Sequence, residues 1–106
     1  MKIAQVYVQN QLAGELIEMD ERTYIFRYLD DYQSAPVSLT MPITQKEYHF
    51  DSFPPFFEGL LPEGLQLESL LRREKIDQKD YFAQLLQVGA DLVGDVTVQA
   101  AGGQGS

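Results

Sequence analysis

The side chains of this chain that are best suited to chemistry are few and widely spaced. The single histidine, His49, lies in the stretch Glu47-Tyr48-His49-Phe50-Asp51, and the chain contains no cysteine. A metal site needs a second imidazole, a thiolate or a tight set of carboxylates at fixed spacing. We therefore interpret His49 as a structural histidine, and we expect neither a bound metal nor a disulfide.

The carboxylates and glycines do not form a catalytic or phosphate-binding motif either. Asp20-Glu21 and Asp30-Asp31 fall at predicted turns, where acidic residues favour the turn and remain solvated. The stretch Gly102-Gly103-Gln104-Gly105-Ser106 is glycine-rich, but it lacks the strand before it and the helix after it that a phosphate loop requires. The glycines of residues 89–94 fit a helix end and a tight return into a strand. The sequence therefore predicts a protein that is not an enzyme and that holds no cofactor.

The charge balance limits the class of partner. The chain has 16 acidic and 8 basic residues, for a net charge of -8 at pH 7. Because contact with phosphates needs clustered Lys and Arg, direct binding to nucleic acid is not expected. Half of the basic residues nevertheless lie close together: Arg72, Arg73, Lys75 and Lys79. This cluster is either a solvated helix end, with cations near the negative end of the helix dipole, or a docking patch for an acidic surface.

The length and hydropathy predict one domain without membrane contact. The chain has 106 residues, enough for one modest core. No run approaches the roughly 18 apolar residues of a membrane span, and the start of the chain lacks the apolar region of a signal peptide. We expect a cytoplasmic location.

Alternating apolar and polar residues predict most of a small antiparallel sheet. The predicted strands 2–8, 12–18 and 23–28 form a meander, with Gly14 at a bulge or bend. Residues 36–42 alternate between prolines, with Val37, Leu39 and Met41 on one face, and are expected to be a short edge segment. Residues 43–52 are expected to be a loop or a short extended piece. A late strand is predicted at 94–99.

The middle of the chain changes to a helical period. A short helix is predicted over 54–61, and a second over 62–73, whose Leu67, Leu70 and Leu71 form one core-facing stripe. A third helix is predicted after Asp77 as N-cap, with Gly89 at its C′ position. The fold class is therefore α+β, with a small antiparallel sheet, made of a meander plus a late returning strand, packed with about three helices.

One segment has an unusual composition. The stretch 53–64, Phe-Pro-Pro-Phe-Phe-Glu-Gly-Leu-Leu-Pro-Glu-Gly, combines aromatics, prolines, glycines and leucines. Proline fixes the backbone, so such a segment holds apolar side chains on a rigid surface. Two interpretations remain open: Phe53, Phe56 and Phe57 tie the helices to the sheet, or part of the cluster, with Leu60 and Leu61, is exposed and fills a pocket on a partner.

Three segments in this order resemble a known family. They are Pro36-Val37-Ser38-Leu39-Thr40-Met41-Pro42, Phe56-Phe57-Glu58-Gly59-Leu60-Leu61-Pro62-Glu63-Gly64, and Asp80-Tyr81-Phe82-Ala83-Gln84-Leu85-Leu86 with Gly89-Ala90-Asp91-Leu92-Val93-Gly94. They are similar to the N-terminal subdomain of HipA-type serine/threonine kinases, the toxins of bacterial toxin–antitoxin modules. The resemblance covers residues 1–100 and leaves 101–106 as a flexible Gly-rich tail.

The resemblance also implies a partner. The kinase body that follows this subdomain in the family has no counterpart here, so kinase activity is not implied. The chain looks like a free-standing version of the subdomain, as in HipBST systems. There a small HipS-like antitoxin accompanies a shortened kinase, HipT, and a helix-turn-helix DNA-binding protein, HipB. We expect an antitoxin that binds and neutralises a HipT- or HipA-like kinase, with HipB as a further partner in a ternary complex.

The partner-binding residues expected from the resemblance and the composition lie in one short segment: Phe57, Glu58, Leu60, Leu61, Pro62 and Glu63. Two alternatives remain open at this point. The domain would be a non-catalytic structural or activating subunit that completes the kinase fold in trans, or the excised N-terminal subdomain of a full-length kinase.

Overall fold

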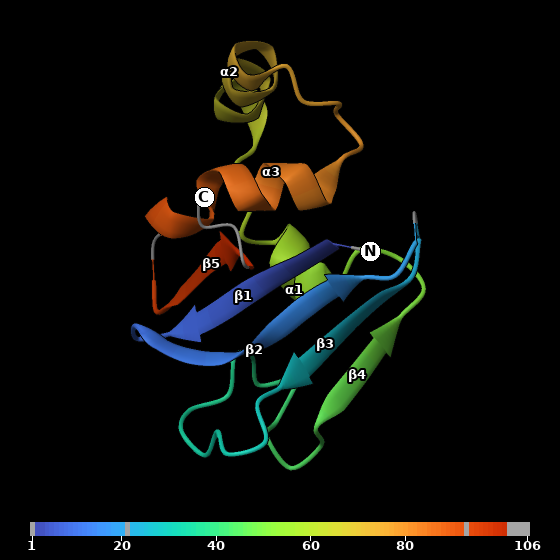
Figure 1. Ribbon diagram of the computed structural model, residues 1–106. Helices are drawn as coiled ribbons and strands as arrows, with labels where there is room; N and C mark the ends of the chain where they lie inside the picture. The colour runs from blue at the N-terminus through green and yellow to red at the C-terminus, as the bar shows by residue number, and fades with distance from the viewer. Residues whose placement is uncertain (1, 21, 93, 102–106) are drawn as a thin grey trace.

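Five strands form one antiparallel sheet in the order β4-β3-β2-β1-β5 (Figure 1). The computed structural model describes residues 2–20, 22–92 and 94–101. The strands are β1 Lys2–Val8, β2 Gln11–Glu18, β3 Tyr24–Tyr28, β4 Glu47–Phe50 and β5 Val96–Ala100. The α+β fold class, the meander and the late returning strand are confirmed, and β5 pairs antiparallel with β1. Most of the predicted tail lies outside the described residues.

The first hairpin contains the predicted bulge. Gly14 pairs with Val6, whereas Leu12 pairs with Tyr7, so Ala13 is the extra residue on β2. A Cβ atom on Gly14 would lie 2.2 Å from the carbonyl oxygen of Arg27. Glycine at this position therefore lets β2 and β3 approach each other at the bulge.

Residues 36–52 differ in part from their prediction. Residues 47–50 form β4, whose register on β3 pairs Phe26 with Tyr48, so of the two predicted alternatives for 43–52 the short extended piece is confirmed. Residues 38–41 form a tight turn instead of an edge segment, with the Met41 N–H donating to the Ser38 carbonyl oxygen at 2.9 Å. Val37 and Met41 are buried, but the turn leaves Leu39 92% exposed.

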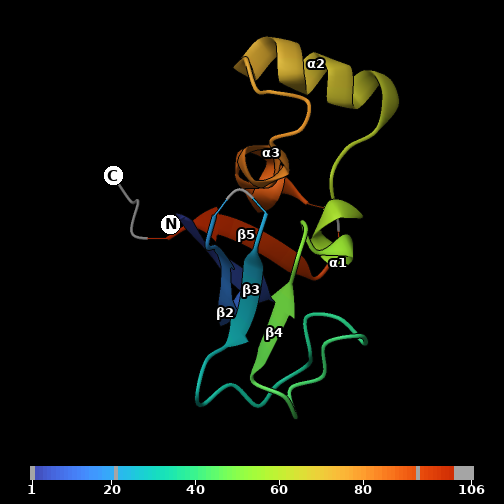
Figure 2. The same ribbon diagram turned by 90° about the vertical axis from the view of Figure 1, so that its right-hand side faces the viewer.

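Three α-helices and a short 3₁₀ turn follow β4. They are α1 Pro55–Glu58, α2 Gly64–Glu74, α3 Tyr81–Val88 and the 3₁₀ turn η1 Gly89–Asp91. They lie to one side of the sheet, and α2 is the outermost, beyond α3 (Figures 1 and 2). Among the described residues, no helix is long and apolar enough to cross a membrane.

The core lies between one face of the sheet and helices α1 and α3. Its largest fully buried side chains are Phe26 from β3, Phe57 from α1, Leu16 from β2, and Phe82 and Leu85 from α3. In α2, by contrast, only Leu70 of the predicted stripe is buried, while Leu67 and Leu71 are half-buried. Helix α2 is therefore attached to the domain through a small apolar contact.

The helix ends differ from the predicted ones. Helix α2 begins at Gly64, not Pro62. The N-cap of α3 is Asp80, whose carboxylate accepts a hydrogen bond from the Ala83 N–H at 3.1 Å, whereas Asp77 accepts from the Lys79 N–H in the preceding turn. Gly89 has a right-handed φ of -59° and continues into the 3₁₀ turn. Its role is steric, because a Cβ atom there would lie 2.3 Å from the Val98 carbonyl oxygen on β5.

Candidate docking site between the helices

The candidate site is built on the aromatic residues at the start of α1. Pro54 is extended and caps a helix that begins at Pro55, where the missing N–H costs no hydrogen bond. Phe57 points into the core and its ring centroid lies 5.8 Å from that of Phe26. Phe53 packs edge-on against Tyr24, with centroids 5.3 Å apart. Both aromatic side chains are buried, which confirms that they tie the helices to the sheet.

The residues after α1 are held in a turn that leaves their side chains half-exposed. The Leu60 N–H donates to the Phe57 carbonyl oxygen, and the Leu61 N–H donates to the Glu58 carbonyl oxygen, both at 3.1 Å. Leu60, Leu61 and Pro62 are consequently neither core nor fully solvated. The buried Phe57 ring anchors the start of this turn in the core. The apolar side chains of residues 60–62 are therefore preorganised at the surface.

This turn forms one wall of an open groove with a volume of ≈ 590 Å³, which we call the interhelical groove. Its lining residues come from the α1–α2 connection, the first turn of α2, the end of α3 and the residue after η1. They are Gly59, Leu60, Leu61, Pro62, Glu63, Gln66, Val88 and Leu92. Apolar side chains line this groove together with the polar Glu63 and Gln66, so it offers a partner both apolar and polar contacts.

The structure divides the six expected partner-binding residues into two groups. Phe57 is 0% exposed and belongs to the core, so the expectation that its side chain contacts a partner directly needs correction. Leu60, Leu61, Pro62 and Glu63 line the interhelical groove. Glu58 is exposed on α1, outside the groove lining.

Sequence reasoning missed the residues that complete the groove. Leu92 lies in the third segment that carried the family resemblance, and Val88 lies between the two stretches of that segment, both about 30 positions from Leu60. Their local pattern indicates only a helix end and a loop. No signal in the sequence indicates that they lie beside residues 60–62, because that proximity depends on how α3 packs against α1.

A second hollow lies at the edge of the sheet. It has a volume of ≈ 300 Å³ and is lined by Thr40, Met41, Tyr48, Phe50 and residues 54–56. The Tyr48 hydroxyl donates to the Pro42 carbonyl oxygen at 2.6 Å, and the Thr40 hydroxyl is bonded to that of Ser38. With its polar groups already bonded and no charged side chain in its lining, this hollow offers little to orient a partner.

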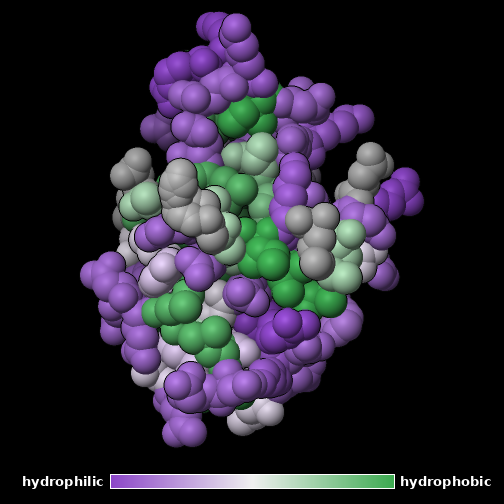
Figure 3. Space-filling view, viewed as in Figure 1, coloured by the Kyte–Doolittle hydropathy of each residue, from purple (hydrophilic) through white to green (hydrophobic). Residues whose placement is uncertain are grey.

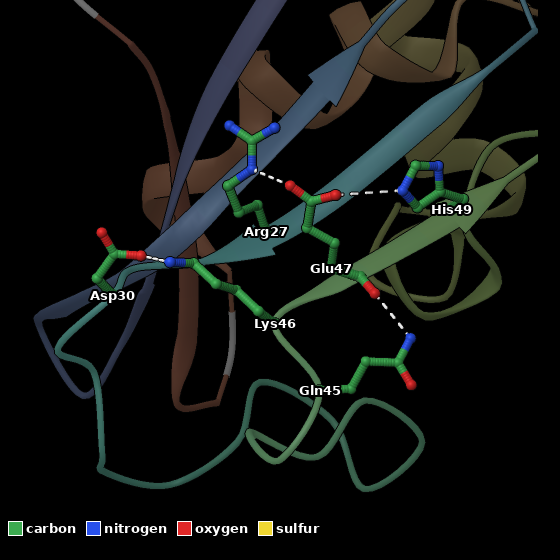
Figure 4. Close-up of polar contacts among 6 residues, drawn as sticks. All are labelled: Arg27, Asp30, Gln45, Lys46, Glu47 and His49. Atoms are coloured by element: carbon green, nitrogen blue, oxygen red, sulfur yellow. Dashed lines mark hydrogen bonds and ion pairs between the residues drawn. The ribbon is translucent and has the colours of Figure 1, made fainter.

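His49 lies in a polar surface network (Figure 4). The Arg27 Nε donates to Glu47 Oε2 at 2.7 Å, and His49 Nε2 lies 3.3 Å from Glu47 Oε1. The hydrogen bond from Arg27, followed by the one with His49, holds the pKa of Glu47 below its ordinary value. The exposed network keeps the carboxylate ionised and ties β3 to β4, in keeping with a structural histidine.

Within the described part of the chain, no three His, Cys, Asp or Glu side chains gather into a group that could hold a metal ion.

The basic residues Arg72, Arg73, Lys75 and Lys79 are exposed at the end of α2 and in the turn that follows. Viewed as in Figure 1, α2 is largely hydrophilic at its outer surface, with hydrophobic surface below it (Figure 3).

The family model and a solved structure that match this chain both name the HipA N-terminal domain. The family model described as the HipA N-terminal domain matches residues 4–99. An uncharacterized protein of Haemophilus influenzae is 34% identical over 99 residues, which cover 93% of this chain and 92% of that protein. A solved structure titled "N-terminal domain of HipA toxin" superposes with a TM-score of 0.77 and is 31% identical, covering 98% of this chain and 96% of that chain.

Proposed function

Because the chain belongs to the HipA N-terminal domain family, we propose that it binds a HipA-like serine/threonine kinase and neutralises it. The observation that carries the proposal is the interhelical groove, where Leu60, Leu61 and Pro62 are held half-exposed above the buried Phe57. A preorganised apolar surface loses little conformational freedom on binding, so more of the contact energy appears as affinity. The proposal assigns the domain to the cytoplasm, where the kinase has ATP.

Inhibition by this route requires no catalytic group on the domain. A kinase docked in the groove would be neutralised because the domain blocks the access of substrate or ATP to it. Alternatively, the domain would hold the two kinase lobes in an inactive arrangement. The net charge of -8 favours approach to the basic, phosphate-binding region of a kinase, because opposite charges accelerate encounter.

The test uses the purified domain and a purified HipA-like kinase from the same organism. We expect a stable complex and a loss of autophosphorylation when the domain is added. Leu61→Asp should weaken binding by about tenfold or more, because it replaces an apolar side chain of the groove lining with a charged one. Leu39→Asp, at a position that is 92% exposed and outside the groove, is the matched control.

The control separates a docking role from a folding role. Circular dichroism should show that both variants keep the wild-type spectrum. If the wild-type domain forms no complex with the kinase, the proposed function is wrong. If Leu61→Asp and Leu39→Asp bind equally well, the kinase is bound elsewhere on the domain.

A second function is favoured by one observation. The solved structure that resembles this chain is titled as a domain of the HipA toxin itself. A domain of that kind would complete a kinase in trans and support its activity. The same kinase assay separates the two: a rise in phosphorylation on adding the domain favours the activating subunit, and a fall favours the antitoxin.

A further inference from the structure

A further hollow, distinct from the one at the edge of the sheet, extends the interhelical groove along α2. It has a volume of ≈ 440 Å³ and is lined by residues of α2 that include Leu65, Ser69, Leu70 and Arg73. It shares Pro62, Gln66 and Val88 with the interhelical groove, so the two hollows form one continuous surface. We call this second part the α2 extension. Leu65 is 81% exposed there and adds apolar surface.

This surface carries opposite charges at the two ends of α2. Glu63 lines the interhelical groove at the N-cap of α2, and Arg73 lines the α2 extension in the last turn of the same helix. Position 73 follows position 63 by ten residue steps, so at a rise of about 1.5 Å per residue their backbones lie about 15 Å apart along the helix axis.

Neither charge is strongly engaged within the domain. Among the described residues, Glu63 makes no side-chain hydrogen bond or ion pair, and its carboxylate does not cap α2. The Arg73 Nε lies 3.1 Å from Glu74 Oε2, an exposed pair of adjacent residues. Exposed pairs of this kind contribute little stability. Both groups are therefore available to a partner at small cost to the fold.

We infer that the kinase segment bound by this surface has an apolar centre flanked by a basic residue, which pairs with Glu63, and an acidic residue, which pairs with Arg73. This inference rests on the proposed function and adds the chemistry and direction of the partner segment. Apolar contacts in the middle supply affinity, and the two charges fix the direction in which the segment lies. A segment with the opposite order of charges would meet like charges at both ends.

The test compares charge reversals inside and outside the groove. Glu63→Lys and Arg73→Glu change residues that line the surface, whereas Glu68→Lys and Arg72→Glu make the same changes on α2 at positions outside the lining. Binding to the purified HipA-like kinase is measured by titration calorimetry at low and moderate salt. The groove variants should each weaken binding by about tenfold, and the matched controls by less than about threefold.

Rescue from the kinase side provides the second arm. A cross-linker attached at position 63 identifies the basic kinase residue that lies opposite it. Reversing the charge of that kinase residue should restore the affinity of the kinase for Glu63→Lys and should weaken its affinity for the wild-type domain. If the groove variants and the control variants change the affinity equally, or if neither changes it, the inference is wrong. In that case the proposed function still holds, provided that the wild-type domain binds and inhibits the kinase. Absence of any wild-type complex would overturn both.

Discussion

The hydroxyl of Tyr28 donates a hydrogen bond to the carbonyl oxygen of Met41 at 2.5 Å. The same hydroxyl accepts from the N–H of Val37 at 2.9 Å. One phenol on β3 thus holds both ends of the 38–41 turn. That turn supplies Met41 to the core and leaves Leu39 in solvent.

Tyr28→Phe should destabilise the domain by about 1–3 kcal/mol, because it leaves a buried N–H and a buried carbonyl without their partner. The midpoint of urea unfolding measures the effect. Tyr7→Phe is the control, since its half-buried hydroxyl makes only a 3.3 Å bond to Gln5. Equal midpoints for Tyr28→Phe and the wild type would show that the turn does not depend on the phenol.

Gly89→Ala should lower the free energy of unfolding by about 1–3 kcal/mol, since the added methyl group overlaps the Val98 carbonyl oxygen and pushes α3 away from β5. Gly59→Ala is the matched control, because its nearest neighbour would be 3.4 Å from the new Cβ atom and its φ is right-handed. Thermal unfolding followed by circular dichroism compares the two. A loss of stability in the control alone would contradict the steric role of Gly89.

Phe57→Ala should cost about 3–5 kcal/mol of unfolding free energy, as expected for removal of a fully buried aromatic ring. Leu65→Ala also truncates a large apolar side chain, but at a position that is 81% exposed, and should change stability by less than about 0.5 kcal/mol. Chemical denaturation of both variants tests the assignment of Phe57 to the core. If Phe57→Ala unfolds like the wild type, that ring does not anchor α1.

Asp80→Ala should destabilise α3 by about 1 kcal/mol, since the Ala83 N–H loses its cap. Asp80→Asn, which keeps an acceptor oxygen, should retain most of the stability. Amide hydrogen exchange in the first turn of α3 reports the change directly. Unchanged protection of the Ala83 amide in Asp80→Ala would contradict the assignment of the N-cap.

The domain should lose stability in strongly alkaline solution. Burial, with a further contribution from the hydrogen bond to Glu18, raises the pKa of Tyr24 to about 12. Burial also raises the pKa of Tyr28 and of Tyr32. The folded state therefore favours the protonated phenols, and their stabilisation is complete below the unfolded pKa of about 10 and lost as the pH rises through the folded values.

Urea midpoints measured across this alkaline range, with tyrosinate absorbance as the second signal, check the prediction. Tyr24→Phe should reduce the pH dependence, because one of the raised phenols is gone. The absence of tryptophan leaves the tyrosinate signal unobscured. A midpoint that does not fall with rising pH would show that these phenols ionise equally in the folded and unfolded chains.

Local patterns of residues were sufficient to predict the sheet meander, the late strand and three helices. Their apolar periods are local, and each reports which side of its own element is buried. They left β4 open between a loop and a short extended piece, because a strand of four residues is stabilised by its pairing with β3 rather than by its own pattern. They also placed the α3 cap three residues early, since Asp77 and Asp80 are both good capping residues.

Which side chains of residues 53–64 are buried depends on how the helices and the sheet pack together. Composition alone predicts a rigid apolar segment without indicating which side chains are covered. Packing of residues 53–58 against the sheet, beside α3, buries Phe53 and Phe57 and leaves Leu60, Leu61 and Pro62 half-exposed. The same packing brings Val88 and Leu92 to the opposite wall of the interhelical groove. Contacts between residues so far apart in the chain depend on the fit of whole elements, which local periodicity does not encode.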